Sequence, residues 1–159
     1  MLAIIWHSRT GASRAMAQAA YAAAQEIGPV RLLPAEAVAA EDLIGARGYL
    51  FACPENLGAL SGMMKEALDR LYYPLLGRIE GRAYATLIAA GSDGTGAERQ
   101  LDRIVTGWRL RRVADSLIVN LGAQTPEAIL APKALDQAQL DRCADLGGAL
   151  AQGLALGVF

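Results

Sequence analysis

Five short apolar runs alternate along the chain with longer segments of helical character, and this alternation constrains the fold most strongly. The runs are Leu2–Trp6, Val30–Leu33, Tyr49–Cys53, Ala83–Ala90 and Ser116–Leu121. Strands that alternate with helices form βαβ units, because a parallel connection needs a crossover long enough to contain a helix. The sequence therefore predicts an α/β fold, with a five-stranded parallel sheet and helices on both of its faces.

The segments between these runs carry signals for helices. Arg14–Ile27 is rich in alanine, has apolar residues at helical spacing, and is stopped by Gly28 and Pro29. Ser61–Leu71 is amphipathic, and Ser61 is the expected N-cap. The remaining predicted helices are Glu41–Ile44, Ala97–Trp108 and Leu135–Leu154, the last preceded by a connector over Thr125–Pro132. No linker is long enough to divide the chain, so residues 1–159 are expected to form one domain.

The charge balance argues against nucleic acid and against an anionic membrane as partners. The chain has 15 basic and 16 acidic residues, so no broad electrostatic attraction to either is expected. The cluster of Arg109, Arg111 and Arg112 is interpreted as a solvated helix end. The apolar stretch Leu146–Phe159 is too short and too interrupted to span a membrane. Met1 runs directly into a strand pattern without a leader, so a cytoplasmic location is expected.

A loop rich in hydroxyl groups lies between the first strand and the first helix. It has the sequence Ser8-Arg9-Thr10-Gly11-Ala12-Ser13. A helix N-terminus presents unpaired backbone N–H groups, so a phosphate placed there gains hydrogen bonds without a lysine. The three hydroxyls can add bonds, and Gly11 lets the backbone approach closely. An ordinary N-capped turn has the same composition, so the loop alone leaves both interpretations open.

Other phosphate-handling folds do not fit this loop. Both the G-x-G-x-x-G fingerprint of dinucleotide-binding domains and the Gly-Lys-Ser/Thr ending of the P-loop are absent. A phosphorelay receiver domain would need clustered carboxylates after the first strand, which instead ends in Trp6-His7-Ser8. A protein-tyrosine phosphatase would need a cysteine in the loop, and there is none.

The segment from Ser8 to Ser13 resembles the phosphate loop of the flavodoxin-like superfamily. In that loop a hydroxyl residue, any residue, Thr-Gly, any residue and Ser or Thr surround the phosphate of flavin mononucleotide (FMN). The resemblance implies a flavodoxin-like three-layer sandwich with FMN as cofactor. It implies that the phosphate is bound by Ser8, Arg9, Thr10, Gly11, Ala12 and Ser13.

Two further loops fall where this superfamily has its other flavin contacts. The first follows the third strand and resembles that of the flavin and quinone reductases of the superfamily. The resemblance implies that it lines the edge of the isoalloxazine ring with Pro54, Glu55, Asn56, Leu57 and Gly58. The second follows the fourth strand and contributes Gly91, Ser92, Asp93 and Gly94. A glycine-rich loop is a weak signal alone, so the resemblance depends on the order of all three loops.

The resemblance implies two functional classes. One is an oxidoreductase that takes hydride from NADH or NADPH onto FMN and reduces a quinone, a nitro compound or another small acceptor. The other is a flavodoxin, an electron carrier that docks on protein partners. Flavodoxins are strongly acidic as a family and often stack an aromatic residue on the flavin ring. This chain has balanced charge and no aromatic residue in the second loop, and both features favour the reductase.

The short length of the chain weighs against the reductase. The larger quinone reductases complete their active site with insertions, and this chain lacks them. A flavodoxin-like binding module that has lost flavin is a third functional class that the sequence allows. A homo-oligomer, a dimer or a tetramer, is expected from the resemblance.

Several conspicuous side chains are assigned structural roles. His7 is the only histidine, so neither a histidine-based triad nor a multi-histidine metal site can form, and no catalytic side chain is expected. Cys53, like the other cysteine, is expected to be a buried free thiol. Lys65 and Asp69 are expected to form an i, i+4 ion pair. Leu71–Leu76 is interpreted either as core or as a subunit contact.

Overall fold

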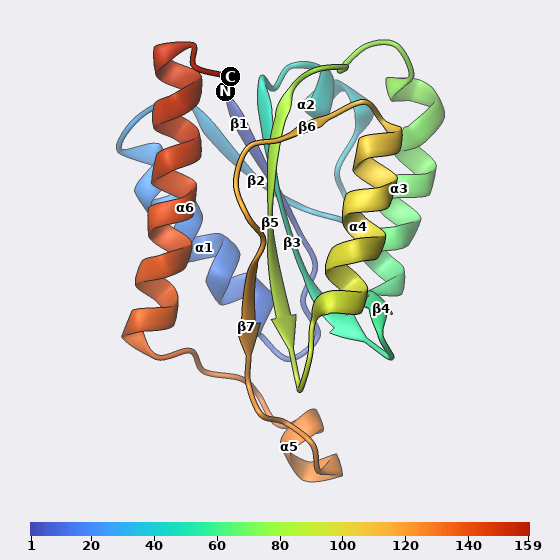
Figure 1. The fold of residues 1–159 in the computed structure, drawn as a ribbon, viewed down its shortest axis with the longest axis vertical. Helices are drawn as coiled ribbons and strands as arrows, with labels where there is room; N and C mark the ends of the chain where they lie inside the picture. The colour runs from blue at the N-terminus through green and yellow to red at the C-terminus, as the bar shows by residue number, and fades with distance from the viewer.

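A parallel sheet with helices against both faces forms the centre of the computed structural model, which describes residues 1–159 (Figure 1). Its strands follow the order β2-β1-β3-β5, and β6 and β7 both pair with β5. The strands are β1 (Leu2–Trp6), β2 (Val30–Pro34), β3 (Gly48–Asn56), β4 (Ala59–Leu60), β5 (Ala83–Ala90), β6 (Arg111–Arg112) and β7 (Leu117–Asn120). The helices are α1 (Ala12–Gln25), α2 (Ala40–Ile44), α3 (Gly62–Leu75), α4 (Thr95–Gly107), α5 (Pro126–Leu130) and α6 (Gln137–Leu156).

The sheet has seven strands, so the prediction of five was wrong, although the α/β class was correct. One cause is that β6 and β7 occupy the fifth position in succession, both parallel to β5. Between them the chain leaves the ladder, and the Thr86 hydroxyl of β5 contacts the Ser116 hydroxyl. The other cause is β4, which pairs antiparallel with the end of β3.

The third strand continues through Pro54, where the sequence predicted its end. Proline has no N–H to give to a neighbouring strand, so it is tolerated only where no partner requires one. The last ladder bond from β1 runs from the His7 N–H to the Ala52 carbonyl, so β1 has ended before Pro54 is reached. The Pro54 carbonyl accepts from the Ser61 N–H instead, at 3.2 Å. β3 and β4 therefore form a hairpin that extends beyond the edge of the parallel sheet.

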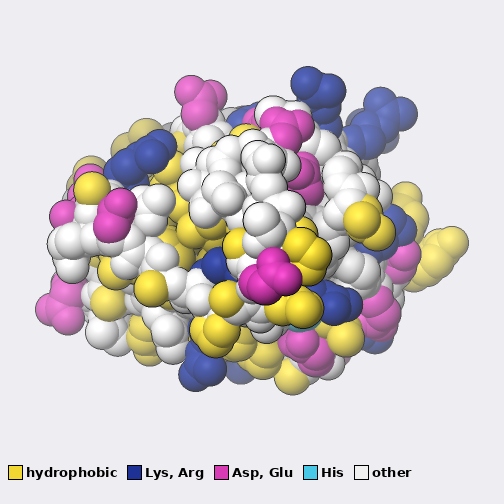
Figure 2. Space-filling view, turned by 90° about the horizontal axis from the view of Figure 1, so that it is seen from below, with side chains coloured by type: hydrophobic (Ala, Val, Ile, Leu, Met, Phe, Trp, Pro, Cys, Tyr) yellow, Lys and Arg dark blue, Asp and Glu magenta, His cyan; other side chains and the backbone are white.

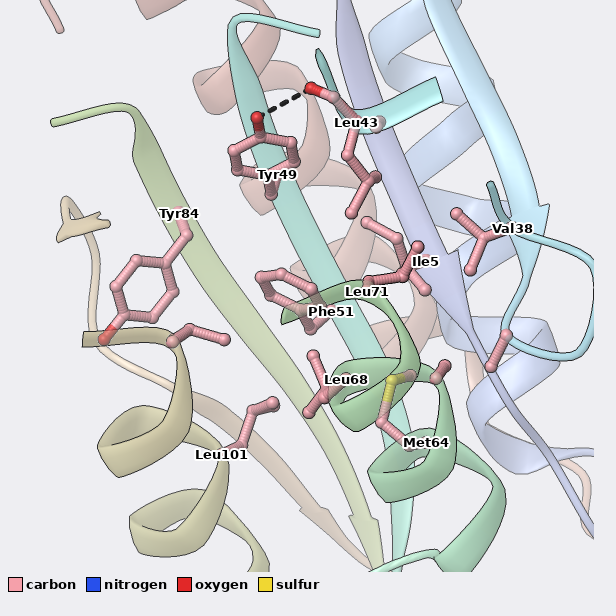
Figure 3. Packing of buried hydrophobic residues seen from close by; sticks show 14 of the residues in the cluster. Ile5, Val38, Leu43, Tyr49, Phe51, Met64, Leu68, Leu71, Tyr84 and Leu101 are labelled. Carbon is pink, nitrogen blue, oxygen red and sulfur yellow. Dashed lines mark hydrogen bonds between the residues drawn. The ribbon is translucent and has the colours of Figure 1, made fainter. Parts of the chain in front are cut away.

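Both faces of the sheet are covered, which explains why its strands are continuous apolar runs. α1 and α6 pack against one face, while α2, α3 and α4 pack against the other (Figure 1). In the core between the sheet and α2, α3 and α4, residues of α3 lie beside residues of the sheet (Figure 3). Those of α3 are Met64, Leu68 and Leu71, and those of the sheet are Phe51 and Ile5. The buried Tyr49 hydroxyl donates to the Leu43 carbonyl at 2.8 Å, so this buried polar group has a hydrogen-bond partner.

The helix boundaries differ from prediction where they meet the loops of interest. α1 begins at Ala12 rather than Arg14, so Ala12 and Ser13 lie in its first turn. The connector Thr125–Pro132 contains α5, and the Thr125 hydroxyl caps it by accepting from the Ala128 N–H at 3.2 Å. None of the helices combines the length and the apolar character that a membrane-spanning segment needs.

The contact between α1 and α6 is a backbone contact. A Cβ atom on Gly147 would lie 2.3 Å from the Ala20 carbonyl oxygen, so only glycine fits at this position of α6. At the adjacent Gly148 a Cβ atom would lie 3.7 Å from the Ile27 Cδ1 atom, which is an ordinary contact distance. The backbone contact therefore requires glycine at position 147 but not at position 148.

We expect Gly147→Ala to lower the free energy of unfolding by about 2 kcal/mol, because the added methyl group meets backbone that cannot turn away. The matched control is Gly148→Ala, which we expect to raise stability by up to about 1 kcal/mol, since alanine favours a helix over glycine. Urea unfolding of both variants measures the difference. Equal effects of the two substitutions would contradict the backbone contact.

Candidate functional site

The three predicted loops meet at the carboxyl edge of the parallel strands, at the lower end of Figure 1. This is the edge at which open α/β sheets bind ligands. Figure 2 looks onto it and shows hydrophobic side chains among acidic and basic ones, with neither sign dominating. All the predicted site residues lie at this edge, in the loop before α1 and its first turn, in the β3–β4 hairpin and in the loop before α4.

The first loop leaves the N-terminus of α1 open. Gly11 is the N-cap and has φ 102°, a conformation that favours glycine. The first main-chain bond of the helix runs from the Ala15 N–H to the Gly11 carbonyl at 3.0 Å. The N–H groups of Ala12, Ser13 and Arg14 therefore have no acceptor within the helix. The Ser8 hydroxyl accepts from the Gly11 N–H at 3.1 Å, which keeps the loop turned and leaves the hydroxyl proton free to donate.

Ser13 adds a second, independent sign of a missing partner. Its side chain is 1% exposed, and its Oγ is the one buried side-chain oxygen or nitrogen atom without a hydrogen bond. Burying an unpaired hydroxyl costs about 1–3 kcal/mol, so native structures rarely contain one. The open helix end and this hydroxyl lie in the same turn, and together they fit an anion with several acceptor oxygens.

The N-terminus of α4, in contrast, is filled by a carboxylate of the protein. Glu55 accepts from the Gly94 N–H at 2.9 Å through one oxygen and from the Ala97 N–H at 3.1 Å through the other. A negative charge at a helix N-terminus is favourable, and here it satisfies two N–H groups. This helix end is therefore not available to an anion from solution.

The β3–β4 hairpin is fixed to α4 by further contacts. A Cβ atom on Gly96 would lie 2.1 Å from the Gly58 carbonyl oxygen, so the hairpin backbone rests directly on the first turn of α4. The Leu60 N–H also donates to the Gln100 side-chain oxygen at 2.9 Å. The second and third predicted loops thus form one structural unit, although they are far apart in the sequence.

The tip of this hairpin exposes an apolar side chain. Leu57 and Gly58 have φ values of 53° and 73°, which is the geometry of a type I′ turn. Leucine is unusual in such a position, because a side chain disfavours the left-handed region. The Leu57 side chain has 106% relative exposure and projects into solvent beside the site.

His7 connects the first loop to the start of α3. Its Nδ1 lies 2.8 Å from the Ser61 hydroxyl, and its Nε2 lies 3.8 Å from a carboxylate oxygen of Glu36. Ser61 is at the N-cap position, as predicted, but its hydroxyl bonds His7 and makes no cap bond. Burial lowers the pKa of His7, while the charge of Glu36 opposes this shift and that of Arg9 adds to it.

The other conspicuous side chains have structural surroundings. Burial raises the pKa of the Cys53 thiol to about 12, so this thiol is protonated at neutral pH, and both cysteines are buried and free. Lys65 and Asp69 form the predicted ion pair on the surface of α3 at 2.6 Å.

Sequence reasoning missed two supports of the site. The Lys133 N–H donates to the Thr10 carbonyl at 2.7 Å, so the connection between α5 and α6 packs on the first loop. Asn120, at the end of β7, donates from its side-chain amide to the Ser92 carbonyl and so braces the third loop. Neither contact has a local signal, because each joins segments that only the fold brings together.

Comparisons with known proteins agree with this geometry. A curated flavodoxin from Aquifex aeolicus is 26% identical over 164 residues, which cover 96% of this chain and 86% of that protein. The solved structure of an archaeal flavodoxin superposes with a TM-score of 0.78 at 16% identity, covering 98% of this chain and 99% of the other. The chain therefore has a flavodoxin-like fold.

Other flavodoxin-like structures extend the comparison. A flavodoxin from Streptococcus pneumoniae has a TM-score of 0.74 at 18% identity and covers 95% of this chain and 98% of its own. The rubredoxin:oxygen oxidoreductase of Desulfovibrio gigas has a TM-score of 0.80 at 13% identity, but this chain covers only 36% of it. No model of a known protein family matches the chain. The superfamily resemblance of the sequence is thus confirmed at the level of the fold.

We expect the stability of the protein to fall as the pH drops from 7.5 to 5.5, because the unfolded chain protonates its histidine near the ordinary pKa of 6.5 while folded His7 resists protonation. The slope attributable to one histidine is at most about 1.4 kcal/mol per pH unit. His7→Asn, which keeps an amide toward Ser61, should flatten the profile, and Glu36→Gln should steepen it. Urea unfolding across this pH range measures both changes, and a profile unchanged in His7→Asn would contradict the assignment.

Proposed function

We propose that this protein binds FMN, with the phosphate at the N-terminus of α1. The unpaired Ser13 hydroxyl carries the proposal, because it lies in the first turn of a long helix at this edge whose N-terminal N–H groups are left open. The start of α4 is filled by Glu55, and that of α6 is capped by Asp136. The start of α3 has no side-chain cap either, because the Ser61 hydroxyl bonds His7, but it holds no buried hydroxyl without a partner. The full-length similarity to a flavodoxin supports FMN as the anion.

The residues of the first loop fit a doubly charged phosphate. The hydroxyls of Ser8, Thr10 and Ser13 and the open N–H groups of the first turn would donate to its oxygens. Arg9 and Arg14 would add positive charge, and Arg14 lies with its guanidinium carbon 5.9 Å from the centre of the Trp6 ring. Gly11 and Ala12 supply backbone without bulk.

The remaining predicted residues would line the ring. Pro54, Glu55, Asn56, Leu57 and Gly58 belong to the hairpin, and Gly91, Ser92, Asp93 and Gly94 to the loop before α4. Since the Glu55 carboxylate is bound to α4, the hairpin would present its backbone groups and Leu57 to the flavin. When bound, FMN supplies reversible hydride and electron transfer, and the protein supplies position and hydrogen bonds.

We propose further that the protein is an NAD(P)H-dependent reductase of a quinone or another small electron acceptor. The mixed charges around the site and the absence of an aromatic residue over the hairpin support a small partner (Figure 2). The second candidate is a flavodoxin-type electron carrier, which the similarity to flavodoxins over nearly the whole chain supports. A dimer or tetramer is part of the proposal by resemblance, and light scattering measures it.

A flavin-free binding module is the third candidate, and it does not explain why the buried Ser13 hydroxyl has no hydrogen-bond partner. Incubation of the purified protein with FMN, NADH or NADPH and a quinone separates the three candidates. Rapid consumption of the nicotinamide supports the reductase, and a yellow protein without turnover supports the carrier. A protein that shows no saturable binding of FMN overturns the proposal.

Ser13→Ala tests the phosphate site in two independent ways. We expect the variant without flavin to be more stable by about 1 kcal/mol, because it no longer buries an unpaired hydroxyl. We expect it to bind FMN at least about tenfold more weakly, because a hydrogen bond to a charged group is lost. Unfolding by urea and quenching of flavin fluorescence measure the two effects.

Thr106→Ala is the matched control, since its hydroxyl donates to the Asp102 carbonyl near the far end of α4. This variant should leave FMN affinity unchanged. FMN affinity equal in Ser13→Ala and the parent protein would place the phosphate elsewhere.

A further inference from the structure

The connection between β7 and α6 reaches the proposed phosphate site from a part of the chain outside the three predicted loops. Near its start, a Cβ atom on Gly91 of the third loop would lie 2.8 Å from the Ala123 carbonyl oxygen. Near its end, the Lys133 N–H donates to the Thr10 carbonyl at 2.7 Å. The connection is therefore fastened to two of the loops, and α5 lies between the two attachments, at the lower end of Figure 1.

The main chain of Lys133 lies against the N-terminus of α1. Its carbonyl oxygen is 3.5 Å from the point that a Cβ atom on Gly11, the N-cap of that helix, would occupy. The five bonds from the Cα atom of a lysine to its Nζ span about 6 Å. The Lys133 ammonium group can therefore reach an anion bound at the open first turn, where the unpaired Ser13 hydroxyl lies.

The Lys133 side chain has no acidic partner. Its Nζ donates to the Ile129 carbonyl at 3.0 Å and also to the Ala131 carbonyl, at the C-terminal end of α5. Lys65, the other lysine of the chain, pairs with Asp69 instead. Lys133 is thus a half-buried lysine whose positive charge is held only by neutral carbonyl groups.

A phosphate is a better acceptor for this ammonium group than the end of α5 is. A hydrogen bond between two charged groups is stronger than one that ends on a neutral carbonyl. α5 has only five residues, so the partial negative charge at its C-terminal end is small. None of the residues of α5 is buried, so water can replace the ammonium group at these carbonyls. Turning to a phosphate therefore leaves no buried polar group without a partner.

We infer that Lys133 is a further phosphate-binding residue, whose ammonium group turns from the end of α5 to an oxygen of the bound FMN phosphate. The inference rests on the proposed FMN site and adds to it a residue that none of the three loops contains. The contact involves the phosphate alone, so it strengthens the binding of FMN and not that of riboflavin, which has the same ring without a phosphate.

Lys133→Gln removes the charge and keeps an amide that can donate to the carbonyls of α5. We expect this variant to bind FMN at least about fivefold more weakly, because a charge-assisted bond is lost, and to bind riboflavin within about twofold of the parent protein. Lys133→Arg keeps the charge and should stay within about threefold of the parent affinity for FMN. Quenching of flavin fluorescence measures each affinity.

Lys65→Gln is the matched control, since it removes the same charge from the lysine that pairs with Asp69 on the surface of α3. It should leave FMN affinity within about twofold of the parent protein, because an exposed charge acts weakly at a distance. The far-ultraviolet circular dichroism and melting temperature of each variant report whether it is folded.

The presence of only two lysines allows a direct test of where the Lys133 ammonium group lies. Acetic anhydride acetylates accessible amines, and mass spectrometry of the peptides reports the extent of modification at each lysine. We expect saturating FMN to slow the acetylation of Lys133 at least about threefold and to leave that of Lys65 unchanged. Riboflavin should protect neither lysine.

Four results would overturn the inference while leaving the FMN site in place. They are unchanged FMN affinity in Lys133→Gln, an equal loss in Lys65→Gln, an equal loss of riboflavin affinity in Lys133→Gln, and acetylation of Lys133 that FMN does not slow. The absence of saturable FMN binding by the parent protein would instead overturn the proposed function together with the inference.

Discussion

A parallel sheet with crossover helices directs the N-terminal end of every following helix to the same edge, and each of these positive ends must be satisfied. α1, α3 and α4 all begin at the carboxyl edge here. Glu55 neutralises the start of α4, and Ser61 at the start of α3 is bonded to His7. Neither α1 nor α3 has a side-chain cap on its first N–H groups, and α1 alone adds an unpaired buried hydroxyl. The location of the proposed anion site thus follows from the presence of an open helix end and an unpaired hydroxyl in the same turn.

The contacts of Glu55 also join the two loops proposed to line the flavin ring. Its carboxylate, the close backbone contact at Gly96 and the Gln100 bond fasten the β3–β4 hairpin to α4. A ligand edge between these loops would meet preformed surfaces, so little conformational entropy would be lost on binding. The first loop is braced separately, by Ser8 within it and by the Lys133 N–H from the α5–α6 connection.

Local signals in the sequence were sufficient for the class of fold and for the location of the loops. Apolar runs, helix stops and the Thr10-Gly11 turn each act over a few residues, so they can be recognised without the structure. Contacts between distant segments could not be predicted in this way. The split of the fifth strand position depends on where Thr86 meets Ser116, and the continuation of β3 through Pro54 depends on where β1 ends. Glu55 shows the same limit, because its main-chain partners lie about 40 residues away at the start of another helix.

The contact of Gly147 with Ala20 also fixes the position of α1 along its own axis. Without an intervening side chain the two helix backbones interlock at this point, and α1 cannot slide along its own axis. A slide would carry Gly11 and Ser13 away from the ends of the neighbouring strands. We therefore expect the turn after α1, around residues 26–29, to absorb insertions or deletions while the first turn of the helix keeps its place.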